Sequence, residues 1–323
     1  WTWEAVAEFD GQPQRRFLVE ERGQPVAVAA AQVRRMGLGR SFWYVPHGPV
    51  TDYAHPAAGE RLRALIEGLA SEARADRALA IRLEPRLDEA ASEVGLLDAL
   101  AHRVPERLQV GQTRIVDLPE DDDALMAGFD ADTRNAIRRA TREGVEVSQV
   151  TDPSDRAAVD RLYGLVEETQ RRARFRLPPR ERYWTAWQAL AGAGGACLLE
   201  ARHGDELLAS GMLVVEGAQS FYLFAGSRRE AAGAPKRFAS YGTQWAMMHE
   251  ARARGARRHD LWGIAPAGAG PEHPWYGVGL FKRGFGGHVV TWAGSWEIVI
   301  DPLAYRVRAA AARLRRRTPR DVP

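Results

Sequence analysis

An internal repeat constrains the fold of this chain more than any other feature. The same order of elements is expected twice: a β-hairpin, a third strand, an amphipathic helix and a returning strand. The first copy has expected strands at 16–20, 25–33, 41–45 and 79–83, with a helix around 61–69. The second copy has expected strands at 196–201, 207–215, 220–224 and 259–262, with a helix at 239–254.

The two copies keep a nearly constant register. Gly23 matches Gly204 at an offset of 181 residues, and Ser41 matches Ser220 at an offset of 179. An ordered set of turn, strand and helix matches at a fixed period is the mark of duplicated architecture. Because a returning parallel strand requires a helical crossover, each copy predicts an α/β unit with a mixed sheet flanked by helices.

The length agrees with two such units. A chain of 323 residues exceeds the size at which one hydrophobic core usually stops growing. We expect a first domain at 1–147 and a second at 148–294. The last segment, 295–323, contains a strand and a helix without a hairpin of its own, so we expect it to pack back on the first domain.

Cysteine and histidine usage excludes several kinds of site. The single cysteine, Cys197, lies in an apolar run, which predicts a buried thiol, no internal disulfide and a reducing, cytoplasmic location. The eight histidines include no pair at helical i, i+4 spacing with a carboxylate base, so no metal site is expected. The sequence contains no run of about 18 apolar residues, so no transmembrane helix is expected.

Lys282 is one of only two lysines, since 43 of the 45 basic side chains are arginine. It lies in the segment Gly-Leu-Phe-Lys-Arg-Gly-Phe-Gly-Gly at 279–287. Lysine offers a compact, movable point charge where arginine offers a planar fork, and glycines let another backbone or a substrate approach closely. Lys282 is therefore predicted to touch a reacting or charged group. A surface lysine in a tight turn is the alternative.

Several segments, in this order, resemble the Fem family of peptidoglycan-bridge aminoacyltransferases. The most specific is Phe281-Lys282-Arg283-Gly284-Phe285-Gly286-Gly287. The others are residues 44–50, 134–147, 220–227, 241–245 and 260–264. One departure is His47, where the family usually has arginine.

The resemblance implies two tandem domains of the Gcn5-related acetyltransferase type. The region 150–195 has no long heptad run, so no coiled-coil arm is expected. The implied reaction moves an amino acid from aminoacyl-tRNA to an amine of a muramyl stem peptide, in UDP-MurNAc-pentapeptide or lipid II. It needs no cofactor and no covalent enzyme intermediate. The implied partners are these substrates and, through a lipid-linked precursor, the inner membrane face, but not DNA.

The resemblance also implies roles for particular residues. Lys282 would stabilise the carbonyl or leaving oxygen, and Phe281 would shape the site beside it. The candidates for binding the precursor, several of which compete for one role, are Arg34, Arg35, Arg172, Arg180, Tyr183, Tyr222 and Tyr241. Asp260 is the carboxylate that we would test as a general base, with local capping or pairing as its other reading.

Other functions stay open at this stage. Some Fem-like proteins serve peptide-antibiotic assembly or resistance. An acyl-CoA-dependent N-acyltransferase would share the fold, and residues 34–39 match the spacing of its pyrophosphate loop, although they precede a strand and not the main helix. The arginine-rich end at 306–320 would also suit an RNA-binding protein, or tRNA contact within the enzyme.

Overall fold

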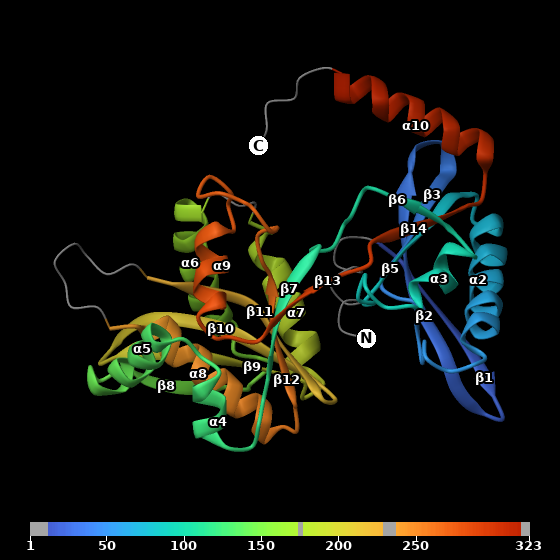
Figure 1. Cartoon of the computed structure of the whole chain (residues 1–323). Helices are drawn as coiled ribbons and strands as arrows, with labels where there is room; N and C mark the ends of the chain where they lie inside the picture. Colours follow the sequence, from blue (N-terminus) through green and yellow to red (C-terminus); the bar gives the residue numbers. More distant parts are fainter. Residues whose placement is uncertain (1–11, 174–176, 229–236, 318–323) are drawn as a thin grey trace. The chain divides into compact units, whose positions relative to one another are not determined.

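The computed structural model describes residues 12–173, 177–228 and 237–317 (Figure 1). In this part the chain forms two compact units. Domain 1 comprises residues 12–109 together with 291–317, and domain 2 comprises residues 110–290.

Domain 1 is built on a seven-stranded sheet with the order β1-β2-β3-β5-β14-β6, in which β4 pairs with β2. Its strands are β1 (Gln14–Glu21), β2 (Gln24–Met36), β3 (Arg40–His47), β4 (Val50–Thr51), β5 (Ala78–Pro85), β6 (His102–Val104) and β14 (Ser295–Val299). Its helices are η1 (Gly37–Gly39), α2 (Ala58–Ala75), α3 (Val94–Asp98) and α10 (Pro302–Arg317).

The core of domain 1 lies between the sheet and α2. The buried face of α2 carries Leu62, Leu65 and Leu69, whose i, i+3 and i+4 spacing forms one apolar stripe. This stripe belongs to the same cluster as Trp43 of β3 and Trp296 of β14. All eight residues of β5 are buried, as expected for a central strand with a neighbour on each side.

Domain 2 also contains a seven-stranded sheet, with the order β13-β7-β12-β11-β10-β9-β8. Its strands are β7 (Gln112–Asp117), β8 (Glu146–Val150), β9 (Ala196–His203), β10 (Glu206–Glu216), β11 (Gln219–Ser227), β12 (Arg258–Gly263) and β13 (His288–Thr291). Its helices are α4 (Asp122–Ala127), α5 (Ala131–Arg142), α6 (Arg156–Ala173), α7 (Arg180–Gly192), α8 (Ala239–Ala253) and α9 (Tyr276–Arg283).

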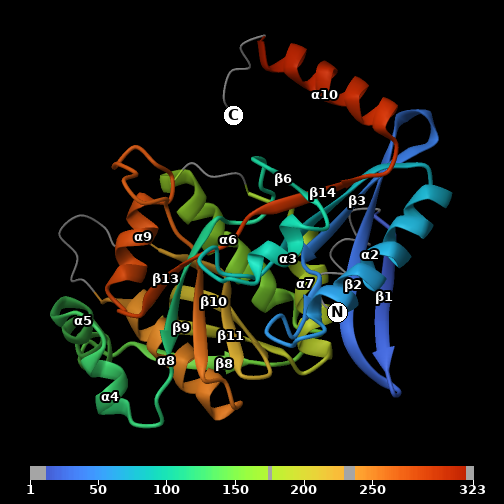
Figure 2. The same ribbon diagram turned by 45° about the vertical axis from the view of Figure 1, so that its right-hand side comes forward.

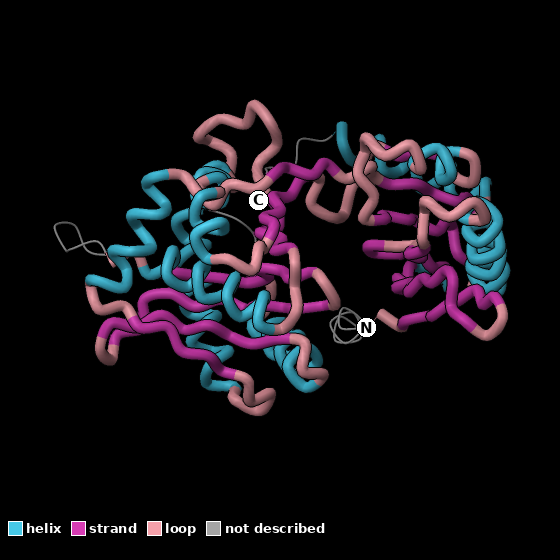
Figure 3. The backbone as a smooth tube through the Cα atoms, turned by 60° about the horizontal axis from the view of Figure 1, so that its bottom comes forward, coloured by secondary structure: helices cyan, strands magenta, loops and turns pink. Residues whose placement is uncertain are grey.

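Helices cover both faces of the domain 2 sheet (Figure 3). On one face α6 and α7 enclose a cluster that includes Leu162, Trp187 and Met212. The other face packs against α8, through Met247 and Met248, in a second cluster. Cys197 of β9 is fully buried in that second cluster, which confirms its expected burial, and burial raises the pKa of its thiol to about 11.

Both copies of the repeat have the same strand pairing. In domain 1, β1, β2 and β3 are antiparallel neighbours, and β5 returns parallel to β3 after helix α2. In domain 2, β9, β10 and β11 are antiparallel neighbours, and β12 returns parallel to β11 after α8 (Figure 2). The expected fold class, two mixed α/β units in tandem, is confirmed. In the described chain the longest helices, α2 and α6, have 18 residues each.

The domain boundary differs from the one expected after residue 147. Residues 110–147 belong to domain 2, because β7 pairs with β12 and β8, which starts in this segment, pairs with β9. These strands extend the second sheet on both sides of its repeat, which the repeat pattern alone does not reveal. At the carboxyl end, β14 pairs with β5 and so joins the sheet of domain 1.

Candidate active site

The central strands of domain 2 separate and open a cavity. β11 and β12 pair in parallel only from Gln219 to Phe221 and from Arg258 to Asp260, after which β11 continues to Ser227 without this partner. A cavity of about 890 Å3 lies where the strands part. Its walls come from β10, β11, β12, α6, α8, α9 and the loop that ends at Trp275, and they include Tyr222, Trp262, Gly263, Phe281 and Lys282.

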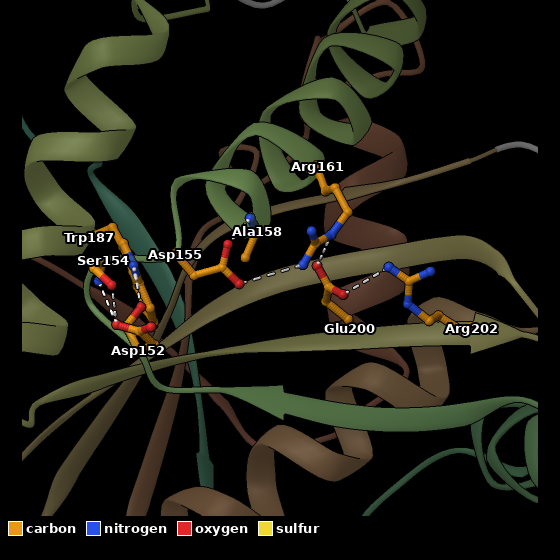
Figure 4. Close-up of polar contacts among 8 residues, drawn as sticks. All are labelled: Asp152, Ser154, Asp155, Ala158, Arg161, Trp187, Glu200 and Arg202. Atoms are coloured by element: carbon orange, nitrogen blue, oxygen red, sulfur yellow. Dashed lines mark hydrogen bonds and ion pairs between the residues drawn. The ribbon is translucent and has the colours of Figure 1, made fainter.

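Helix α6, which contributes Thr169 to this cavity, is tied to the sheet by polar contacts nearer its start (Figure 4). The buried carboxylate of Glu200 on β9 accepts hydrogen bonds from Arg161 Nε of α6, at 2.8 Å, and from Arg202. At the start of α6, Asp155 caps the backbone N–H of Ala158. Gly226 of β11 then lies so close to α6 that a Cβ there would meet the Leu165 carbonyl carbon at 2.3 Å.

Lys282 lies in the last turn of α9 with 5% of its surface exposed. Its Nζ donates a hydrogen bond to the Gly263 carbonyl at 2.7 Å and lies 6.0 Å from the centre of the Tyr222 ring. Burial lowers the pKa of this amine to about 7, and the negative charge of Asp260 partly opposes that shift. The alternative of a surface lysine in a turn is therefore wrong, and a lysine that exchanges protons near neutral pH lines the cavity.

The glycines after Lys282 are needed by the protein backbone. A Cβ at Gly286 would meet the Gly128 carbonyl oxygen at 2.0 Å, and a Cβ at Gly287 would meet the Ile115 carbonyl oxygen at 2.1 Å. Both residues have positive φ, a conformation that favours glycine. Arg114 of β7 donates to the Gly286 carbonyl at 2.7 Å. This turn therefore holds the end of α9, and with it Lys282, against β7 and the chain before α5.

Asp260 is fully buried at the point where β12 leaves β11. Its Oδ1 accepts a hydrogen bond from the Trp262 backbone N–H at 2.7 Å and another from Thr113 Oγ1. Trp262 has φ of +66°, a conformation that costs a residue other than glycine on the order of 1 kcal/mol. Because its carboxylate is engaged by internal donors and closed off from solvent, Asp260 does not have the setting of a general base.

Two of the aromatic candidates share the cavity with Lys282. Tyr222 and Phe281 both line it. Burial holds the pKa of the Tyr222 phenol far above its usual range, so this hydroxyl stays protonated. Tyr241 packs behind Phe281, with ring centres 5.0 Å apart, and stacks on Phe285, and it is not among the cavity-lining residues.

The structure places Tyr183 in a different setting from the one expected. Its side chain is 3% exposed and packs against Tyr163 and Phe224 in the core between the sheet, α6 and α7. A contact with a substrate would require this core to rearrange. Arg180, three residues earlier, is exposed in the first turn of α7 and lies over the Tyr163 ring. The side chain of Arg172 lies outside the described residues.

The two arginine candidates of domain 1 differ in their surroundings. Arg35, at the end of β2, forms an ion pair with Asp76 at 2.6 Å and has 53% of its side chain exposed. Arg34 lies with its guanidinium 4.6 Å from the centre of the Tyr44 ring. Both residues lie near the end of strand β2. The expected role of one or the other in binding a diphosphate stays a prediction.

Sequence reasoning missed a group of hydroxyl side chains in the cavity wall. They come from α6, β10, β11 and α8, and they are Thr169, Ser210, Ser227, Ser240 and Thr243. Ser210 Oγ is buried without a hydrogen-bond partner in the described structure. No sequence signal joins these residues, because they lie on four separate elements that only the folded sheet brings together.

A serine–histidine contact is also present, but below the cavity. Ser220 Oγ lies 2.8 Å from His259 Nδ1, and Gln244 Nε2 lies 2.6 Å from His259 Nε2. All three side chains are fully buried, and none is among the cavity-lining residues. Burial lowers the pKa of His259 to about 4, so the ring is neutral near pH 7. This contact ties α8 to the paired part of β11 and β12 and is not a nucleophile at the surface.

The segments considered for an acyl-CoA loop are not arranged as such a loop. Residues 34–36 end strand β2, and Gly37–Gly39 form the short helix η1 before β3, so this segment does not start the main helix α2. Of the matching segment in the second copy, residues 229–234 lie outside the described residues.

Within the described ranges, no three side chains of His, Cys, Asp or Glu come together as a metal site would require. The same part of the chain contains no helix that is both long and apolar enough to cross a membrane.

Comparisons with known proteins agree with this architecture. Residues 196–313 match the model of the FemAB family. A crystal structure of FemX superimposes with a TM-score of 0.84 at 20% identity, over 95% of this chain and 92% of FemX. These matches show the fold of the chain and, over residues 196–313, its similarity to the FemAB family.

More distant similarity supports the same fold. A tandem GNAT protein from the clavulanic acid biosynthesis pathway matches with a TM-score of 0.52 at 17% identity, over 90% of this chain and 84% of that protein. Two curated relatives are the lipid II:glycine glycyltransferases of Staphylococcus saprophyticus and Staphylococcus aureus. Each is 22% identical, and each match covers 94% of this chain and 88% of the relative.

Proposed function

We propose that this protein is a peptidoglycan-bridge aminoacyltransferase. It would take an amino acid from aminoacyl-tRNA and place it on an amine of the stem peptide of UDP-MurNAc-pentapeptide or lipid II. The observation that carries this proposal is the buried Lys282 amine in the wall of a cavity, in a chain whose relatives are named lipid II:glycine glycyltransferases.

The chemistry requires little beyond alignment and charge stabilisation. The acceptor amine attacks the ester carbonyl, a C–N bond forms, and the C–O bond to the ribose breaks. The amine loses a proton, and the ribose oxygen gains one. Ester aminolysis is downhill, so catalysis consists mainly of holding the two substrates together and stabilising the oxyanion.

Lys282 has the properties that this step needs. With its pKa at about 7, about half of the amines carry a proton at neutral pH. The charged form can stabilise the oxyanion and donate a proton to the leaving oxygen. The low-dielectric surroundings that lower its pKa also strengthen its attraction for a developing negative charge. Phe281 and Tyr222 would exclude water beside it.

A transfer assay tests the proposal. The protein is incubated with tRNA charged with labelled glycine, alanine or serine and with UDP-MurNAc-pentapeptide, and in a parallel reaction with lipid II. We expect label on the precursor with the wild type and a loss of at least 100-fold with Lys282→Ala, the scale on which removal of one charge-stabilising donor acts. Lys282→Arg should not restore activity, because a planar guanidinium does not fit the space of a buried amine.

The matched control is Arg283→Ala, which removes an exposed cation from the next position of the same helix. It should retain near-wild-type transfer. If acyl-CoA were consumed with a simple amine while no charged tRNA reacted, the protein would instead be an acyl-CoA-dependent N-acyltransferase. Transfer from tRNA to acceptors other than wall precursors would indicate a role in peptide-antibiotic assembly or resistance.

A further inference from the structure

The bend in β12 creates the hydrogen bond that holds Lys282. The register between β12 and β7 is regular through Asp260 and shifts before Gly263, and Trp262 between them has positive φ. After the bend, the Gly263 carbonyl faces Lys282 Nζ at 2.7 Å. Any side chain at position 263 would require Val110 to move, since a Cβ there would lie 2.7 Å from Val110 Cγ1.

Asp260 supplies the contacts that keep this bend in place. Its Oδ1 accepts from the backbone N–H of Trp262, two residues later, and from the hydroxyl of Thr113 on the neighbouring strand β7. A continuous chain of hydrogen-bonded and covalent links therefore runs from Thr113 through Asp260 and the bend to the Lys282 amine. Strained backbone at a bend persists when its surroundings fix it in this way.

Asp260 also acts on Lys282 through its charge. A buried ammonium is disfavoured, and a nearby buried carboxylate makes it less so. The other titratable groups near the amine come from several elements. Tyr222 on β11 and His259 on β12 are neutral near pH 7, and Glu272 and His273 of the loop line the same cavity. Arg283 follows Lys282 on α9 and is exposed.

We propose that Asp260, held by Thr113, is the positioning residue for Lys282. It fixes the bend that presents the Gly263 carbonyl to the amine, and it supports the charged form of that amine. This inference deepens the proposed function, since it concerns the lysine of the same site. It replaces a general-base role for Asp260 with an indirect one.

The two-lysine composition allows a direct test that needs no substrate. In protein labelled with 13C-lysine, Lys282 and Lys236 give two side-chain signals, and Lys236→Arg assigns them. The 13Cε shift is followed against pH in the wild type and in Asp260→Asn, which keeps the side-chain shape but removes the charge. We expect the Lys282 pKa to fall by about one pH unit in Asp260→Asn. The control Asp117→Asn, at an exposed position of β7, should leave it unchanged.

Thr113→Val provides a second measurement if Asp260→Asn does not fold. It removes the hydroxyl but keeps the carboxylate, so the Trp262 amide should exchange with solvent at least tenfold faster. Thr113→Ser should restore the slow exchange. An unchanged Lys282 pKa in folded Asp260→Asn, or unchanged Trp262 exchange in Thr113→Val, would overturn the proposal. A failed transfer assay alongside the expected shifts would instead count against the proposed function alone.

Discussion

Lys282 combines a functional role with a cost to stability. The pKa of its amine is about 10.5 in solvent and about 7 in the folded protein. Burying the charged amine therefore opposes folding. The folded state binds fewer protons than the unfolded state between these values, and the free energy of unfolding therefore rises with pH from about 7 to 10.5. Below pH 7 the full penalty, about 1.4 kcal/mol for each pH unit between the two values, is present.

Lys282→Met should therefore stabilise the protein while abolishing transfer. Methionine fills a similar volume without a charge. The loss of the hydrogen bond to Gly263 offsets part of the gain, which leaves about 2 kcal/mol at pH 6. The gain should shrink as the pH rises towards 10.5, the pKa of the amine in the unfolded chain, because above that value the wild-type amine is neutral in both states. Guanidinium unfolding at pH 6 and pH 9.5 measures it, with Arg283→Met as the control; equal gains at both pH values would refute the buried-charge explanation.

Some of the candidate site residues could be recognised from the sequence, and others could not. Lys282 could be found because it interrupts an arginine-rich composition. Asp260 was the carboxylate to test as a general base, but the sequence does not show its contact with Thr113. Thr113 lies 147 positions away and meets Asp260 only when β7 joins β12. Tyr183 was a candidate contact to the precursor, and the sequence does not show that α6 and α7 close over it.

At the scale of elements, contact between α6 and β11 determines one wall of the cavity. The backbone of Leu165 approaches Gly226 so closely that no side chain fits between them. The hydroxyl of Thr169, one turn later in α6, accepts a hydrogen bond from the Ser227 N–H at 3.2 Å. Helix α6 therefore contacts β11 from Gly226 to Ser227, and these contacts hold the cavity wall in place.

Gly226→Ala should consequently displace α6 and destabilise domain 2 by about 3 kcal/mol, the upper range for overpacking. Gly164→Ala is a matched control on the same helix, since a Cβ at Gly164 meets nothing within 4 Å. It should stabilise the protein by about 0.5–1 kcal/mol through the better helix propensity of alanine. Urea unfolding distinguishes the two; effects of the same sign would argue against this packing.

Element order was predictable because hydrophobic patterns repeat along the chain. The strands and crossover helices of both copies follow from alternation and 3.6-residue periodicity. The flanking strand β7 was not expected, whereas β14 lies in the carboxyl-terminal segment that was expected to pack back on the first domain. The partner of β7 is β12, which is distant in sequence, and pairing between distant strands leaves little local trace. The misplaced boundary at residue 147 follows from that.

At the scale of the whole molecule, domain 2 is a continuous segment and domain 1 is not. The sheet of domain 1 is completed by β14, whose Trp296 is fully buried in its core. Glu297 on the same strand forms a buried ion pair with Arg82 of β5. Removing one partner of such a pair leaves an uncompensated charge.

Fragments of the chain should therefore behave differently. Residues 110–290 should fold alone with a cooperative transition, whereas residues 12–109 should not. Joining 12–109 to 291–317 through a flexible linker should restore folding of domain 1. Circular dichroism and thermal unfolding measure this, and a cooperatively folded fragment 12–109 would contradict the need for β14.

The late return of β14 gives the chain an order of assembly on the ribosome. Synthesis delivers the first copy of the repeat early, but the strand that covers the edge of β5 emerges only after all of domain 2. Domain 2 is thus the first unit whose strands are all available for folding, although it is second in the sequence. Until then the edge of β5 that later pairs with β14 has unpaired backbone N–H and C=O groups. Such an edge can pair with strands of other nascent chains. A chaperone would accordingly matter most in the interval after residues 12–109 have been synthesised and before β14 emerges.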